Sequence, residues 1–251
     1  KKFFSDATNE VLCQTFMDNA LRDPITNEIG KSIIFCVNVQ HARKVTEILN
    51  KFAEQKFPGK YNSDFAVQIT SNIPDSQQMT INFSNNNLNG HTKWLEDYDS
   101  SKSRIAVTVG MMTTGYDCPD ILNLGIFRPI YSPSEFIQIK GRGTRLNTFK
   151  YEDNKEKKTT FKLFDFFAVC EYFENEFKYD EKIDLPKINE NLGGALGEPS
   201  IIDTVINKGS DTLITLEEEQ VPEIGMKIDR MLYKNFEDKV KEDPNVKQYL
   251  D

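Results

Sequence analysis

A segment near the middle of the chain carries polar side chains at a spacing suited to binding phosphate. Residues 131–146 read YSPSEFIQIKGRGTRL. If this segment is helical, Gln138, Arg142 and Arg145 lie within roughly 60° of one another on one face. Arginine keeps its charge and presents a fixed fork of donors that matches phosphate oxygens. We therefore predict a phosphate-binding face whose arginines point away from the packed side; a solvated basic face is the alternative.

The same segment contains the signals of a helix start. Ser132 is placed to cap it, Pro133 to occupy its first position and Glu135 to complete a capping box, which predicts a helix over 133–146. Glycines inside a well-capped helix cost about 1 kcal/mol each, and this local cost favours a functional reason for them. The opposite, packed face is predicted to carry Phe136, Ile139, Gly143 and Leu146.

A second polar segment follows a predicted buried strand. Residues 104–119 read RIAVTVGMMTTGYDCP, and ligands of open α/β sheets bind beyond the carboxyl ends of strands. Gly115 allows a ligand to approach the backbone, and the loop N–H groups can hold phosphate. Asp117 is suited to accept hydrogen bonds from ribose hydroxyls, and Thr113 and Thr114 to donate to phosphate. An ordinary polar turn is the alternative.

A third segment, SIIFCVNVQH at 32–41, places Asn38 between a strand and a helix. Asn38 is either part of a binding site or the cap of the following helix. We expect His41 to be a helix-surface or packing residue rather than a base or a ligand.

The elements that would position these residues alternate between strand and helix. Such alternation predicts an α/β fold with a parallel sheet and helices on both faces. Strands are predicted at 32–37, 65–70, 104–109, 121–127 and 161–167, and helices at 40–55, 76–83, 92–98, 133–146 and 169–177. Residues 155–158 (KEKK) are expected to form a solvated loop.

The character of the chain changes after about residue 184. Residues 188–199 are polar and glycine-rich, as linkers are. Segments 201–213 and 226–249 have amphipathic helical patterns, and 215–223 is acidic. We therefore expect two parts, 1–185 as the α/β lobe and 186–251 as a linker with a mostly helical extension.

Composition narrows the class of protein. The net charge is −8, with +2 over residues 1–150 and −10 over 151–251, which disfavours a general nucleic-acid coat. Four separated cysteines and two histidines make a zinc site improbable and indicate a reduced, cytoplasmic chain. No apolar run approaches the roughly 18 residues needed to span a membrane. The chain begins without an initiator Met, and we expect an internal fragment.

Motifs IV, V and VI of superfamily two helicases resemble, in this order, the polar segments described above at 32–41, 104–119 and 131–146. TTGYDCP at 113–119 resembles motif V, and QIKGRGTR at 138–145 matches the Q-x-x-G-R-x-x-R of motif VI. Longer stretches resemble the motor (R) subunit of type I restriction enzymes, most strongly over residues 1–170. These stretches are 31–42, 112–146 and 225–240.

That resemblance implies a RecA-like C-terminal helicase lobe in a subunit that hydrolyses ATP to move double-stranded DNA. Arg142 and Arg145 would face the γ-phosphate of ATP bound on a partner lobe. The resemblance assigns nucleotide or coupling roles to Gly115, Asp117, Gln138 and Gly141, and DNA contacts to Asn38, Thr113 and Thr114. The implied partners are DNA, the methyltransferase (M) and specificity (S) subunits, and a first RecA-like lobe and nuclease domain of the same subunit.

Several parts of such an enzyme are missing from the sequence. It contains no G-x-x-x-x-G-K-[ST], no Walker B partner and no nuclease cluster, so ATP and Mg²⁺ would be bound mainly by the absent first lobe. Gly110 stands where the family often has an acidic residue. Two alternatives stay open: a superfamily two translocase or repair helicase outside restriction, and a non-catalytic interaction module of the same fold.

Overall fold

The computed structural model describes residues 5–92, 95, 98, 100–113, 115–167 and 169, and the backbone of 219–220 and 227–231. Its helices are α1 (Asp6–Asn19), α2 (Val39–Lys56), α3 (Ser76–Ser84) and α4 (Pro133–Gly143). Its strands are β1 (Ser32–Cys36), β2 (Ala66–Gln68), β3 (Ile105–Thr108), β4 (Asn123–Phe127), β5 (Thr148–Tyr151), β6 (Asn154–Lys157), β7 (Thr160–Asp165), β8 (Glu219–Gln220) and β9 (Lys227–Met231).

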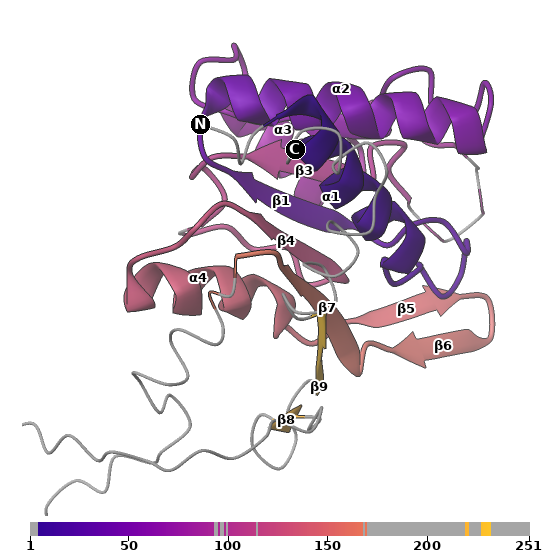
Figure 1. The fold of residues 1–251 in the computed structure, drawn as a ribbon. Coiled ribbons are helices and arrows are strands. Elements are labelled where there is room, and N and C mark those ends of the chain that lie inside the picture. The colour runs from indigo at the N-terminus through magenta and orange to yellow at the C-terminus, as the bar shows by residue number, and fades with distance from the viewer. Residues whose placement is uncertain are drawn as a thin grey trace, which may run out of the picture.

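The centre of the fold is a parallel sheet in the order β2-β3-β1-β4-β7 (Figure 1). Strand β1 lies in the middle, where Ile34 pairs with Val107 of β3 on one side and Gly125 of β4 on the other. The sheet continues through β9, which is parallel to β7, and β8, which is antiparallel to β9. The carboxyl ends of β1, β3, β4 and β7 therefore meet at one edge.

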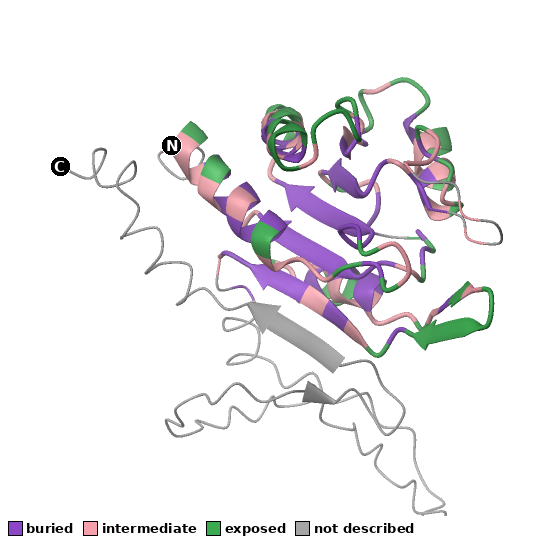
Figure 2. Cartoon of the chain, turned by 90° about the vertical axis from the view of Figure 1, so that its right-hand side faces the viewer, coloured by how far each residue is buried: buried purple, intermediate pink, exposed green. Residues whose placement is uncertain are grey.

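Helices cover both faces of this sheet, and each face has its own apolar core. Helices α1 and α2 pack on one face, over a cluster that includes Phe16, Leu49 and Phe127. Helices α3 and α4 belong to the other, with Phe83 and Phe136 in its core. The strands between them are buried (Figure 2). A five-stranded parallel sheet flanked by helices confirms the predicted α/β class and is consistent with a RecA-like lobe.

The predicted strands of the sheet and the helices α2, α3 and α4 are confirmed, with boundaries that shift by a few residues. The predicted helix at 92–98 is wrong in its described part, where Leu95 and Tyr98 form an antiparallel bridge. Long-range hydrogen bonds explain the difference, since Tyr98 donates to Asp23 and Thr92 to Glu28 at 2.6 Å each.

Two further differences concern strands. Residues 227–231, predicted as helix, form β9. Residues 155–157, expected in a solvated loop, belong to the exposed strand of the β5–β6 hairpin, and Lys158 after them is buried. Helix α1 was not predicted. The predicted helix at 169–177 and most of the predicted 186–251 extension lie outside the described residues, and the division at 185 stays a prediction.

Within the described part of the chain, no helix has both the length and the apolar character needed to cross a membrane. The three cysteines described there, Cys13, Cys36 and Cys118, are buried free thiols. Burial raises the pKa of the Cys118 thiol to about 12, so this thiol is un-ionised at neutral pH.

Candidate functional site

Helix α4 begins at the predicted residue and ends earlier than predicted. The Glu135 side chain pairs with Arg128 instead of completing the predicted capping box. Ser132 occupies the cap, where its hydroxyl accepts from the Glu135 backbone N–H, and Pro133 is in the first turn. The helix ends at Gly143, and the Thr144 hydroxyl donates to the Gly141 carbonyl at 3.2 Å. Arg145 and Leu146 therefore lie beyond the helix, and the predicted packing of Leu146 is wrong because that side chain is 66% exposed.

The packed face of α4 otherwise agrees with the prediction. Phe136 and Ile139 are buried in the core, and Gly143 faces the Phe161 ring of β7. A methyl group at position 143 would overlap that ring, so glycine is required for the close approach of helix and sheet. The same is not true of Gly141, beside which a methyl group would meet no atom within 4 Å.

Arg142 does not point away from the packed side, as the sequence was expected to place it. It is buried, and its Nε and Nη2 donate to the Thr113 carbonyl at 3.2 and 2.8 Å while Nη1 donates to the Tyr116 carbonyl. The prediction fails because the loop after β3 folds over this turn of α4. Arg142 thus fixes the loop of the predicted motif V against the helix of the predicted motif VI.

Arg145 has the more open environment. Its side chain is 34% exposed and forms an ion pair with Asp117, whose side chain is 75% exposed. The loop reaches this position through Gly115, whose φ of +64° lies in the left-handed region that glycine favours. The structure therefore brings Arg145, Arg142 and the loop with Gly115 and Asp117 to one place.

The other candidate residues vary in availability. Gln138 is exposed on α4, and Thr113 is buried with its hydroxyl donating to the Gly110 carbonyl at 2.7 Å. Thr114 lies outside the described residues. Asn38 caps α2, where its side-chain oxygen accepts from the His41 backbone N–H at 2.9 Å, which confirms the capping alternative.

Of the two positions expected for His41, on the helix surface or packed against the protein, the structure has the packed one. Its ring is buried, Nδ1 accepts from the Val37 N–H at 3.3 Å, and Nε2 lies 3.0 Å from Asn9 Oδ1. Burial lowers the pKa of His41 to about 4, so the imidazole is neutral at neutral pH.

Sequence reasoning missed a buried charged cluster under the loop. The Lys31 ammonium lies 2.8 Å from the Asp120 carboxylate and donates to the Phe83 carbonyl at 2.8 Å. Burial opposes ionisation of Asp120, but the charge of Lys31 and the hydrogen bonds from Lys31, Cys118 and Asn86 lower its pKa overall. A lysine before a strand and an aspartate after a Cys-Pro turn carry no pairing signal in sequence, because they stand 89 positions apart.

Lys158 is the second residue that sequence reasoning missed. Only 4% of it is exposed, and its ammonium donates to the carbonyls of Pro119, Gly143 and Arg145. Its neighbours in the KEKK run are exposed, so composition alone pointed to a solvated lysine.

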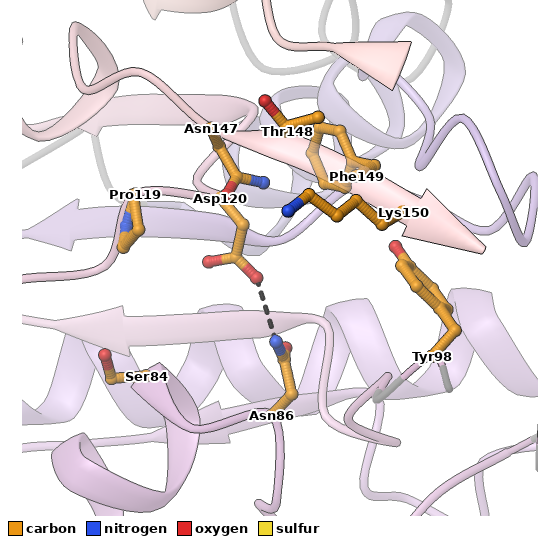
Figure 3. A pocket seen from close by; sticks show the side chains of 9 residues that line it. All are labelled: Ser84, Asn86, Tyr98, Pro119, Asp120, Asn147, Thr148, Phe149 and Lys150. Carbon is orange, nitrogen blue, oxygen red and sulfur yellow. Dashed lines mark hydrogen bonds between the residues drawn. The ribbon is translucent and has the colours of Figure 1, made fainter. Parts of the chain in front are cut away.

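A pocket of about 350 Å³ with a mixed polar and apolar lining lies between the hairpin and the end of α3 (Figure 3). Asp120 forms its inner wall and accepts from Asn86 Nδ2 at 3.1 Å, while Lys150 reaches in from β5. The described residues contain no group of His, Cys, Asp and Glu side chains able to hold a metal ion.

The geometry defines an α/β lobe in which a buried arginine, a partly exposed arginine and a glycine-containing loop meet, and the partly exposed Arg145 is able to contact phosphate oxygens. Comparison with known proteins then gives the relationship. The chain is 31% identical over 163 residues to the type I restriction enzyme EcoKI endonuclease subunit of Escherichia coli K12, covering 63% of this chain and 12% of that protein. It is 28% identical over 171 residues to the EcoAI endonuclease subunit of Escherichia coli, covering 68% of this chain and 18% of that protein.

The chain is therefore a distant homologue of the endonuclease subunits of type I restriction enzymes, and it spans less than a fifth of the length of these two relatives. A solved fragment described as an HsdR subunit of a type I restriction enzyme from Vibrio vulnificus YJ016 is 26% identical, with a TM-score of 0.41, over 59% of this chain and 26% of that chain. No family model matches the sequence.

Proposed function

We propose that this chain is the second RecA-like lobe of the DNA-translocating subunit of a type I restriction enzyme, and that it completes an ATP site shared with a first lobe. The observation that carries the proposal is the meeting of Arg142, Arg145 and the Gly115–Asp117 loop at one place. Homology to the endonuclease subunits supports it independently.

Phosphoryl transfer gives this cluster its chemical role. Charge develops on the γ-phosphate oxygens, and an arginine supplied from another lobe stabilises it. Arg145 is the better placed of the two arginines to do so, since its partner Asp117 is mostly exposed and the pair can open toward a ligand. Arg142 holds the loop in place. On the adjacent part of α4, Gln138 is exposed and Gly141 has open space beside its backbone.

ATP and Mg²⁺ would be held mainly by the first lobe, since the chain has no P-loop sequence. DNA would be gripped through its phosphates, without base readout. Asn38 is a suitable contact because its side-chain oxygen is used in the α2 cap while its amide N–H₂ has no hydrogen-bond partner among the described residues. Thr114 is the other proposed DNA contact, whereas Thr113 is buried and its hydroxyl already donates to the Gly110 carbonyl. The methyltransferase and specificity subunits are the proposed protein partners.

The test is to purify the full-length protein that carries this chain, with and without its methyltransferase and specificity subunits. We expect ATP-dependent cleavage of unmodified plasmid DNA only with all subunits present, and none on methylated DNA. DNA-stimulated ATP hydrolysis that needs neither partner subunit nor an unmodified site would instead identify a translocase outside restriction. Absence of any ATP hydrolysis would identify a non-catalytic module.

A further inference from the structure

Lys158 joins the two segments on which the proposed function depends. Its ammonium lies 2.9 Å from the Pro119 carbonyl, 2.8 Å from that of Gly143 and 3.0 Å from that of Arg145. The first carbonyl ends the loop that carries Asp117, and the other two end the segment that carries Arg142 and Arg145. One side chain therefore holds both ends of the candidate site.

The three contacts use all the hydrogen-bonding capacity of the group. An ammonium has three N–H donors, and each meets a separate backbone carbonyl. The last carbonyls of a helix have no partner within the helix, and a cation near them is favourable. The backbone N–H of Lys158 also donates to the Asn147 carbonyl at 2.9 Å, which fixes the start of the chain segment leading to β7.

We propose that Lys158 is a positioning residue that sets the distance between the arginine end of α4 and the Asp117 loop, so that Arg145 reaches the nucleotide in the right geometry. The proposal rests on the proposed function. Lys158 touches neither nucleotide nor DNA in this account; it acts through Arg145 and Asp117.

The protonation of Lys158 gives this role a measurable signature. The pKa of Lys158 is lowered to about 8, mainly by burial. The charge of Arg145 also lowers this pKa, whereas Asp120 and Cys118 raise it. Asp120 is itself paired with Lys31, so Lys158 has no carboxylate of its own within the described part of the chain. Above pH 8 the neutral amine keeps only two N–H donors for three carbonyls. The contact between the end of α4 and the Asp117 loop therefore loosens. An arginine at 158 would stay charged across this range.

The first experiment measures steady-state ATP hydrolysis of the full-length protein. We expect Lys158→Met to lower kcat about 10–100-fold, because a displacement of about 1 Å costs that much, while KM for ATP stays within threefold. The kcat of the wild type should fall above pH 8, whereas Lys158→Arg should recover part of the activity and lose this fall. Lys157→Met, one residue away on the exposed strand, is the matched control and should behave as wild type.

A second control separates positioning from stability. Leu49→Ala removes a fully buried side chain from the core on the other face of the sheet. It therefore destabilises the lobe without altering the contacts of Lys158. If Leu49→Ala at equal loss of melting temperature lowers kcat as much as Lys158→Met, the positioning role is refuted. It is also refuted if Lys158→Met changes KM and kcat together, or leaves kcat unchanged.

The remaining readout needs no catalysis. In the 251-residue chain, Lys158→Met should speed amide hydrogen exchange at 115–120 and 141–146 more than in the sheet, and unchanged exchange there would overturn the proposal. Failure of the proposed function is seen separately: Arg145→Ala would then retain ATP hydrolysis. If Arg145→Ala is inactive while Lys158→Met is fully active, only the role of Lys158 falls.

Discussion

Arg142 and Arg145 stand three residues apart, yet they occupy different environments. Arg142 is buried and gives its hydrogen bonds to two carbonyls of the loop, whereas Arg145 is partly exposed and paired with an exposed carboxylate. The sequence predicts that both are functional arginines on one helix. It does not predict their division of labour, because the end of α4 at Gly143 and the fold of the loop over Arg142 depend on tertiary packing.

This difference predicts destabilisation of unequal size for the two alanine substitutions. Arg142→Ala leaves the Thr113 and Tyr116 carbonyls without their donor and should lower the free energy of unfolding by about 2–3 kcal/mol. Arg145→Ala removes only a partly exposed ion pair and should cost less than about 1 kcal/mol. Urea denaturation of the 251-residue chain measures both values, and equal losses would contradict the assigned environments.

At the scale of elements, the positions of the sheet strands and of α2 follow from the sequence. Continuous apolar runs mark the strands, and apolar residues at helical spacing mark the helix. Buried runs such as SIIFC at 32–36 and the apolar stripe of α2 allow one interpretation each. The hairpin and the 92–98 segment could not be predicted, since Lys, Glu, Asn and Asp give no periodic signal. The described part of 92–98 depends on distant partners, since Thr92 donates to Glu28 and Tyr98 to Asp23.

Helix α4 provides a matched pair of glycines. Gly143→Ala should destabilise the lobe by about 1–3 kcal/mol, because its methyl group overlaps the Phe161 ring. Gly141→Ala has open space and should instead stabilise the helix by up to about 1 kcal/mol. Thermal unfolding of the two variants distinguishes them, and a stable Gly143→Ala variant would show that α4 does not approach β7 as closely as described.

The start of α2 is predicted to respond to acid through His41. Its pKa in the folded chain is about 4, below the ordinary value of 6.5, so the unfolded state binds more protons between these values. Stability should therefore fall as pH drops from 6.5 to 4, by up to about 3 kcal/mol from this residue. Denaturation of wild type and His41→Gln over this range measures the difference, and parallel curves would refute the assignment.

At the scale of the whole molecule, the lobe has a complete layered core but only half of the proposed nucleotide site. Its arginines can stabilise charge, yet the sequence contains no P-loop lysine, Ser/Thr or Walker B acid to hold phosphates and Mg²⁺. Homology relates the chain to the endonuclease subunits of type I restriction enzymes. The roles of single residues can be argued only from the contacts that the structure describes. Lys31, Asp120 and Lys158 support the loop and could not be identified from spacing.

The purified 251-residue chain is therefore expected to fold, to bind ATP weakly and to show neither DNA-stimulated ATP hydrolysis nor DNA cleavage. Circular dichroism checks the fold, and phosphate release with Mg²⁺ and duplex DNA checks the activity. Robust hydrolysis by this chain would mean that it contains a complete nucleotide site.

The rate of DNA-stimulated ATP hydrolysis by the full-length protein with Arg145→Ala tests the central claim most directly. Loss of an arginine that faces the γ-phosphate costs roughly 10³–10⁵ in rate, and the small stability effect of this substitution keeps the fold intact. Lys157→Ala, which removes an exposed charge from the nearby hairpin, is the control and should keep the wild-type rate. We predict a fall of at least about 10³ for Arg145→Ala; a rate near that of the wild type would contradict the account.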